Sequence, residues 1–235
     1  IRAVVYIDLN VGMNRTGIQP EYALALARFI LTLPHLQLKG IHAYDGHIHD
    51  KDIEQRREKG NKAFAIAEQI LLQIKELTSS PLHIIMGGTP TFPVHTGKPD
   101  VECSPGTFVF WDWGYREMLE DLPFNYAALL LTRVISIIDK NHVCLDLGHK
   151  SVAAEMPLPR VHFLNIPEAI PVFQSEEHLV VQVSDSSLYP VGTLFYGVPI
   201  HICPTVALYD KAHVITDNHV TDFWRVIARD RSINF

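Results

Sequence analysis

The first hundred residues alternate between short apolar runs and segments of helical periodicity, and this alternation constrains the fold more than any other feature. Apolar strands joined by helical crossovers pair in parallel, with right-handed connections. We therefore expect a parallel sheet with helices, either part of a (β/α)8 barrel or an open α/β sheet. The expected strands are Ala3–Leu9, Leu36–Tyr44 and Leu82–Met86, and the expected helices are Pro20–Leu33 and a longer one, capped by Asp50 or Asp52, that ends near Leu77.

After about Lys98 the pattern changes to short strands separated by turn residues, which is typical of an antiparallel β-domain. We therefore expect two domains, over residues 1–100 and 101–235. The proline-containing segment Glu155–Pro171 is expected to be an extended loop. The expected strands of the second domain are Thr107–Trp113, Asn125–Ile138, His142–Leu147, His178–Val183, Gly192–Cys203, Val206–Asp210, His213–Thr216 and Thr221–Ala228.

The composition excludes several classes of protein. The formal net charge is −6 and no run of Lys or Arg is longer than two, so binding to nucleic acid or to a membrane surface is not expected. No apolar run reaches the ~20 residues that a transmembrane helix needs. The 3 cysteines are too few for a disulfide framework and fit a reducing cytoplasm, where we expect the protein to reside.

His201 and Cys203 stand two residues apart at the end of the expected strand Gly192–Cys203. Residues i and i+2 of a strand point to the same face, so the imidazole and the thiolate would lie side by side. Such a pair forms half of a tetrahedral zinc site with positions open for water or substrate, as a Lewis-acid catalyst needs. The alternative is a satisfied core histidine beside a buried, inert cysteine.

Polar loops follow the expected strands at the carboxyl edge of the sheet, where ligands bind in parallel α/β folds. In Gly87–Thr91, adjacent glycines allow close approach of the backbone, and threonine hydroxyls can donate to a phosphate. In Asn10–Gly17, two glycines flank Asn14 and Arg15, which suit an anionic or phenolate oxygen. The alternative for both segments is an ordinary turn.

The loop Tyr44–His49 follows the second expected strand. Tyr44 can donate a hydrogen bond or stack on a ring, and His47 and His49 are candidate acid–base groups. The two histidines also have the spacing of a metal pair, although His201 and Cys203 are the stronger candidates. The alternative for each histidine is a polar residue at the start of a helix.

Several of these segments occur in one order and at fitting spacings, and together they resemble a known family. The chain is similar to the metal-activated, fold-type III pyridoxal-phosphate enzymes of the D-threonine aldolase and D-serine dehydratase family. The resemblance covers nearly the whole chain and implies an alanine-racemase-like barrel followed by a β-domain. It rests on Val11–Gly17, His42–His47, Gly87–Thr91, Ser104–Asp112, Leu145–Lys150, Ser175–His178 and His201–Val206.

The resemblance implies a role for each candidate residue. Asn14 and Arg15 would approach the phenolic oxygen of pyridoxal phosphate, and Tyr44 would approach the pyridine ring. Gly88 and Thr89 would hold the phosphate. His201 and Cys203 would bind a divalent metal, with zinc favoured over manganese because one ligand is a thiolate.

The resemblance also implies that the lysine that binds the cofactor covalently precedes residue 1. The chain begins on an apolar strand with neither an initiator methionine nor a targeting signal, so we expect it to be a fragment. By comparison with a barrel of ~250 residues, about 100–125 residues would be absent. Lys150 does not match the lysine motif and is expected on the surface, so this chain alone is expected to be inactive.

The activity implied by the resemblance is that of a lyase. The expected reaction is cleavage of a D-β-hydroxy amino acid to glycine and an aldehyde, as in D-threonine aldolase. The alternative within the family is dehydration of D-serine with loss of ammonia. Amino-acid racemisation and non-catalytic binding of pyridoxal phosphate are further alternatives on the same barrel, and the family implies a homodimer.

Overall fold

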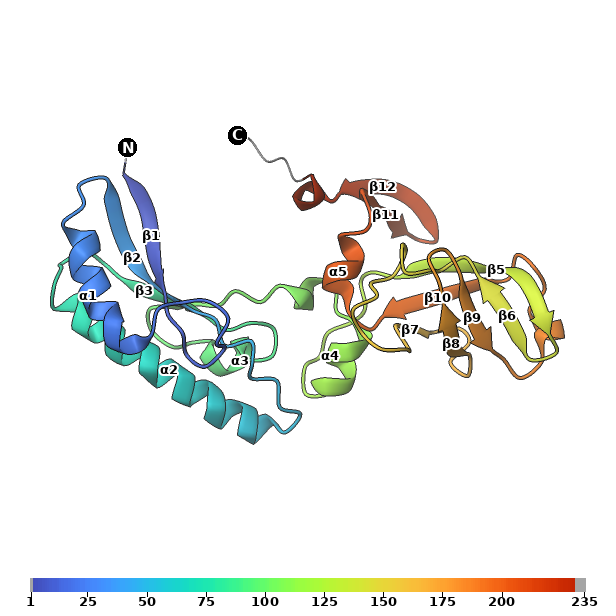
Figure 1. The fold of residues 1–235 in the computed structure, drawn as a ribbon, viewed down its shortest axis with the longest axis horizontal. Coiled ribbons are helices and arrows are strands. Elements are labelled where there is room, and N and C mark those ends of the chain that lie inside the picture. Colours follow the sequence, from blue (N-terminus) through green and yellow to red (C-terminus); the bar gives the residue numbers. More distant parts are fainter. Residues whose placement is uncertain (1, 231–235) are drawn as a thin grey trace. The chain divides into compact units, whose positions relative to one another are not determined.

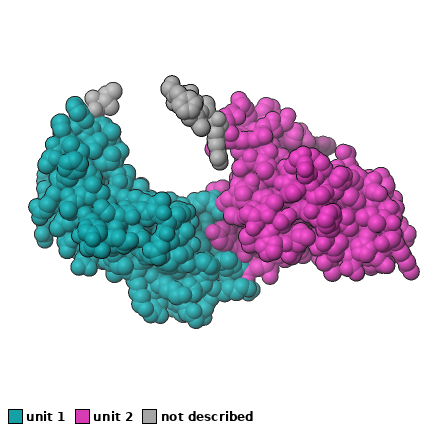
Figure 2. Space-filling model, in the orientation of Figure 1, with its two compact units in different colours: residues 1–108, 118–121 teal, residues 109–117, 122–235 magenta. Residues whose placement is uncertain are grey.

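The computed structural model describes residues 2–230 and divides the chain into two compact units (Figure 2). The first unit comprises residues 1–108 and 118–121, and the second comprises residues 109–117 and 122–235. We retain the domains expected from the sequence, residues 1–100 and 101–235, as a proposal. None of the described helices is both long and apolar enough to cross a membrane.

The first unit is built on a four-stranded parallel sheet in the order β1-β2-β3-β4 (Figure 1). One helix follows each of the first three strands, as expected for crossover connections. This arrangement confirms the α/β part of the expected fold. The strands are β1 (Ala3–Asp8), β2 (Leu36–Ala43), β3 (His83–Met86) and β4 (Val101–Glu102), and the helices are α1 (Pro20–Leu31), α2 (Ile53–Lys75) and α3 (Phe92–His95).

Local sequence signals explain where the two long helices begin. Pro20 occupies the first turn of α1, where its missing N–H is not needed. Asp52 is the N-cap of α2, and its side chain accepts a hydrogen bond from the Gln55 amide at 2.8 Å. Asp50, the other candidate cap, instead pairs with Lys59 at 2.5 Å.

The core of the first unit lies between the helices and one face of the sheet. Successive strand residues point to opposite faces, so one set is buried against the helices, with an irregularity where the register between β1 and β2 shifts. The opposite face is more polar: the Tyr6 hydroxyl lies 2.6 Å from His83 Nε2, and Asp8 Oδ1 lies 2.7 Å from His42 Nδ1. The buried cluster includes Ile7, Leu9, Leu38, Ile41, Ile84 and Met86 from strands and Ala23, Ala27, Ala63, Ala67, Ile70 and Ile74 from helices.

The second unit contains a six-stranded antiparallel sheet and a separate two-stranded hairpin, which confirms the expected β-domain. Phe163 and Phe195 meet edge to face in its core, with ring centroids 5.1 Å apart. The sheet order is β7 (Val161–Phe163), β10 (Leu194–Pro199), β5 (Leu130–Asp139), β6 (His142–Leu145), β9 (Leu179–Gln182) and β8 (Ile170–Gln174), and the hairpin pairs β11 (Lys211–Thr216) with β12 (His219–Arg225).

The strands expected over Asn125–Ile138 and Thr221–Ala228 form over only part of their length, and three other expected strands of this unit contain helix or do not form. Thr107–Trp113 holds a short 3-10 helix, Thr107–Val109, and the start of α4 (Trp113–Met118). The strand expected over Gly192–Cys203 ends at Pro199, and α5 (Ile202–Val206) follows it. Pro204 is the third residue of α5, where a missing N–H costs nothing. Because α5 ends at Val206, the strand expected over Val206–Asp210 does not form.

The extended loop expected over Glu155–Pro171 is also partly wrong, because it contains β7 and the beginning of β8. The prolines of this segment argued against strands. Pro171 nevertheless lies within β8, which is an edge strand, and the register shifts beside it. Edge strands and bulges are the positions where a sheet accepts proline.

Candidate functional site

The loop after β1 is organised by one side chain that sequence reasoning left without a role. Asn10 Oδ1 accepts hydrogen bonds from the Gly12 amide at 3.0 Å and the Asn14 amide at 3.1 Å. Asn10 Nδ2 donates to Asn14 Oδ1 at 2.9 Å. Asn14 has φ 52°, a left-handed conformation that asparagine tolerates better than most residues. The side-chain oxygen of Asn14 is therefore used to shape the loop.

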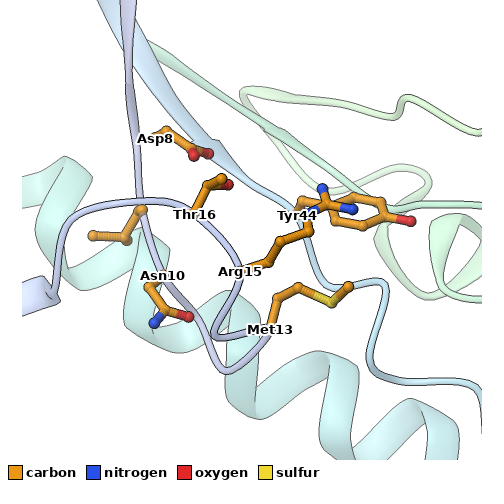
Figure 3. Close-up of a pocket in the computed structure, with 7 residues that line it drawn as sticks. Asp8, Asn10, Met13, Arg15, Thr16 and Tyr44 are labelled. Atoms are coloured by element: carbon orange, nitrogen blue, oxygen red, sulfur yellow. The ribbon is translucent and has the colours of Figure 1, made fainter.

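Arg15 and Tyr44 come together at the carboxyl edge of the sheet. The Arg15 guanidinium lies over the Tyr44 ring, 4.9 Å from its centroid, in a cation–π contact (Figure 3). Both side chains line a cavity of about 10 Å³, enough for about one water molecule. The cavity is too small for a cofactor, so Arg15 and Tyr44 offer a surface at the rim rather than an enclosed pocket.

The loop after β3 is held from beneath by a buried carboxylate. The Gly88 amide donates to Asp45 Oδ1 at 3.3 Å, and the Thr91 hydroxyl donates to the same oxygen at 2.7 Å. Thr89 Oγ1 accepts from the Thr107 amide at 3.1 Å, which leaves its own hydroxyl hydrogen to donate elsewhere. Gly88, which was expected to help hold a phosphate, therefore directs its N–H inward, toward Asp45.

Tyr44 also covers this loop closely. A Cβ added at Gly88 would lie 3.1 Å from Tyr44 Cε2, a distance that side chains rarely tolerate. Glycine at this position therefore lets the ring approach the backbone. Among the residues expected to bind a cofactor, Arg15, Tyr44 and Gly88 form one continuous group.

His201 and Cys203 are in contact, although not on a strand as expected. His201 is the N-cap residue of α5, and Cys203 is the second residue of that helix. The hydrogen bond with the Cys203 side chain and a weaker one with Glu155 outweigh burial and raise the pKa of His201 to about 9. The helix start thus brings the two side chains together in place of the strand.

Two carboxylates support this pair. Glu155 Oε1 lies 2.7 Å from His201 Nδ1, and both side chains are half-exposed. Asp112 is buried, and its two oxygens accept hydrogen bonds from the Ile202 amide at 3.0 Å and the Tyr115 amide at 2.8 Å. Burial raises the pKa of Asp112, with the amide hydrogen bonds opposing that shift. Asp112 therefore fixes the first turn of α5, next to His201.

The donor set of this pair suits a zinc ion, because imidazole and thiolate are ligands that zinc accepts. Within residues 2–230, no group of three or more His, Cys, Asp or Glu side chains has the geometry of a metal site. His201 and Cys203 would therefore supply two protein ligands and leave the other positions to solvent or substrate.

Of the remaining candidate residues, His47 packs against the loop after β1, and no contact links His49 or Lys150 to these groups within the described residues. His47 Nε2 lies against Gly12, where an added Cβ would come within 2.7 Å of it, and His49 is exposed. Lys150 is exposed as expected and pairs with Glu176 and Glu177, each at 2.8 Å.

Family comparisons match both halves of the chain. The profile described as "Alanine racemase, N-terminal domain" matches residues 2–111, and the one described as "Putative serine dehydratase domain" matches residues 127–215. D-threonine aldolase of Arthrobacter sp is 31% identical over 232 residues, which covers 96% of this chain. 3-Hydroxy-D-aspartate aldolase of Paracoccus denitrificans is 25% identical over 239 residues, covering 97% of it.

The fold has solved counterparts. The crystal structure of D-threonine aldolase from Filomicrobium marinum superposes with a TM-score of 0.88 at 23% identity, covering 97% of this chain and 63% of that one. The chain spans 60% of the length of each of the two curated aldolases.

Proposed function

The chain belongs to the fold-type III pyridoxal-phosphate enzymes, with an alanine racemase N-terminal domain followed by a serine dehydratase-like domain. From that membership we propose that the protein is a pyridoxal-phosphate- and metal-dependent lyase that cleaves D-β-hydroxy amino acids to glycine and an aldehyde, as a D-threonine aldolase does. The observation that carries the proposal is the group formed by Arg15, Tyr44 and Gly88 at the carboxyl edge of β1, β2 and β3. The aldolase names of both curated relatives support this reaction.

The residues at this edge fit pyridoxal phosphate. The Arg15 guanidinium, with Asn14 beside it in the loop, would donate to the phenolic oxygen, and the Tyr44 ring would lie against the pyridine ring. The loop containing Gly88 and Thr89 would receive the phosphate, with the Thr89 hydroxyl as a donor. When bound, the cofactor supplies an electron sink for negative charge at the substrate α-carbon.

We further propose that His201 and Cys203 hold a divalent metal, zinc rather than manganese. The thiolate favours zinc because it is a softer ligand than a carboxylate. A bound cation would act as a Lewis acid on the β-hydroxyl of the substrate. Asp112 and Glu155 would keep the two ligands in place, through the α5 turn and the imidazole respectively.

D-serine dehydration is the second candidate function, and two observations favour it. The profile of the serine dehydratase domain matches residues 127–215, and by resemblance a cysteine at the position of Cys203, a proposed metal ligand, favours the dehydratase branch. Both reactions use the same β-hydroxyl, so the same residues serve either outcome.

A homodimer, implied by the family, is part of the proposal.

Product analysis tests the proposal with the full-length protein loaded with pyridoxal phosphate and zinc. D-threonine should give glycine and acetaldehyde if the protein is an aldolase. D-serine should give pyruvate and ammonia if it is a dehydratase. Alanine racemisation without added metal, or no turnover of any D-β-hydroxy amino acid, would overturn the lyase assignment.

A further inference from the structure

Asp45 and His95 form a fully buried pair that the proposed chemistry leaves unused. Asp45 Oδ2 lies 2.9 Å from His95 Nε2, and both side chains are 0% exposed. Asp45 follows β2, whereas His95 is the last residue of α3. A charged side chain is almost never buried without a specific partner, so this pair calls for a physical reason.

The contacts of Asp45 show what the pair does in the fold. Its other oxygen, Oδ1, accepts from the Gly88 amide and from the Thr91 hydroxyl, which lie at the start and the end of one short loop. Asp45 thus connects the loop after β2, which carries Tyr44, to the loop after β3. One carboxylate fixes both.

Burial and hydrogen bonding together set the charge of Asp45. Within residues 2–230, His95 Nδ1 has no hydrogen-bond partner. The hydrogen bond between His95 Nε2–H and Asp45 is therefore the one that holds the ring in this part of the chain. Burial raises the pKa of Asp45, but the hydrogen bonds from His95, Thr91 and Gly88 and the charge interaction with His95 together outweigh it, so the pKa lies below its ordinary value and the carboxylate is charged.

We propose that Asp45 and His95 are positioning residues that hold the Gly88–Thr91 loop in the conformation that binds the cofactor phosphate. This inference rests on the proposed function. By drawing the Gly88 amide inward, Asp45 sets the direction of the following residue, Thr89, whose hydroxyl is the expected phosphate donor. His95 orients the carboxylate by holding its other oxygen, Oδ2.

Electrostatics alone predicts the opposite effect, which makes the inference testable. A carboxylate beneath a phosphate-binding loop repels the phosphate, so a purely electrostatic Asp45 would weaken phosphate binding. Its removal would then strengthen that binding. If Asp45 positions the loop, its removal weakens phosphate binding, because the loop is then free to move.

The experiment compares the affinities of the full-length protein for pyridoxal phosphate and for pyridoxal, which lacks the phosphate. Absorbance titration gives both dissociation constants without any turnover. For Asp45→Ala we expect the preference for pyridoxal phosphate over pyridoxal to fall about tenfold, while the affinity for pyridoxal changes little. Asp45→Asn, whose Oδ1 can still accept from Gly88 and Thr91, should recover most of that preference.

The partner residues provide parallel variants. His95→Leu should lower the same preference, whereas His95→Gln, whose amide can still donate to Asp45, should restore it. Thr91→Val removes one loop contact with little change in volume and reports on the same network if Asp45→Ala does not fold. Asp121→Ala, which removes the partner of buried Arg56 in the same unit, is the control for a loss of stability alone.

The outcomes separate two failures. If the wild-type protein binds pyridoxal phosphate but the preference is unchanged or larger in Asp45→Ala and Thr91→Val, the positioning role is wrong. The same conclusion follows if Asp121→Ala lowers the preference equally. If the wild-type protein does not bind pyridoxal phosphate at all, the proposed function fails first.

Discussion

Glu155 Oε1 lies 2.7 Å from His201 Nδ1, so the carboxylate holds one ring nitrogen and leaves the other for the proposed metal. Outer-shell carboxylates of this kind fix the tautomer and orientation of a ligating histidine. For Glu155→Ala we therefore expect zinc affinity to fall about 10- to 100-fold, and less for Glu155→Gln, which can still accept a hydrogen bond. Zinc titrations of the full-length protein against a competing chelator would measure the change.

The choice of pH matters for this measurement, because the pKa of His201 is raised to about 9. Below that value zinc must displace a proton, and Glu155 contributes to holding that proton. A zinc titration above pH 9 therefore measures how Glu155 orients the His201 imidazole, without competition between zinc and the His201 proton. Glu177→Ala, another exposed carboxylate of the same unit, should leave zinc affinity unchanged, and an equal loss in both variants would contradict the assigned role.

Replacement of Asp112 should lower both the stability of the second unit and its affinity for zinc. Replacement by alanine leaves two amides, those of Ile202 and Tyr115, without their buried acceptor. We expect a loss of about 1–3 kcal/mol in the free energy of unfolding for each unsatisfied group, together with weaker zinc binding. Urea denaturation and zinc titration of Asp112→Ala provide the two measurements. Unchanged zinc affinity in a destabilised but folded variant would show that the α5 turn does not depend on Asp112.

The position of α5 also shows how far the sequence could lead. The pairing of His201 with Cys203 was expected from their spacing, yet the expected strand is the beginning of a helix. Side chains two residues apart can lie side by side on a strand, and they can also do so at the start of a helix when the first residue is the N-cap. Pro204, which argues against a strand, is compatible with a first helical turn and was the available signal.

The Asp45–His95 pair was beyond sequence reasoning for a different reason. The two residues are 50 positions apart, and although the loops were expected to meet at the carboxyl edge of the sheet, no local pattern states which of their side chains pair. By contrast, the parallel strands and the Asp52 cap of α2 follow from periodicity and from local hydrogen bonding, which the sequence does encode.

The buried carboxylate of Asp45 should make stability depend on acid. Its pKa in the folded protein lies below the ordinary value of 3.8, since the hydrogen bonds from His95, Thr91 and Gly88 and the charge interaction with His95 together exceed the effect of burial. The corresponding stabilisation is complete above about pH 5 and is lost as the pH falls through the lowered pKa. In Asp45→Asn this part of the pH dependence should disappear. Free energies of unfolding measured between neutral and strongly acidic pH would show it, and identical profiles for both proteins would contradict a charged Asp45 in the folded protein.

Gly88→Ala tests the close approach of Tyr44 to the loop after β3. The new methyl group would lie 3.1 Å from Tyr44 Cε2, so the ring must shift by a few tenths of an ångström. That shift would disturb the Arg15 guanidinium, which lies 4.9 Å from the ring centroid. We therefore expect cofactor affinity to fall about tenfold, since two of the groups proposed to contact the cofactor are displaced together.

The matched control for this prediction is Gly106→Ala in the same unit, because an added Cβ there has no neighbour within 4 Å. Its affinity for pyridoxal phosphate should equal that of the wild-type protein. Tyr44→Phe keeps the ring, and with it the contact to Arg15, so it should lose less affinity than Gly88→Ala. If Gly88→Ala binds the cofactor as tightly as Gly106→Ala, the Tyr44 ring does not have to lie against the glycine, and the group of Arg15, Tyr44 and Gly88 is not the cofactor surface.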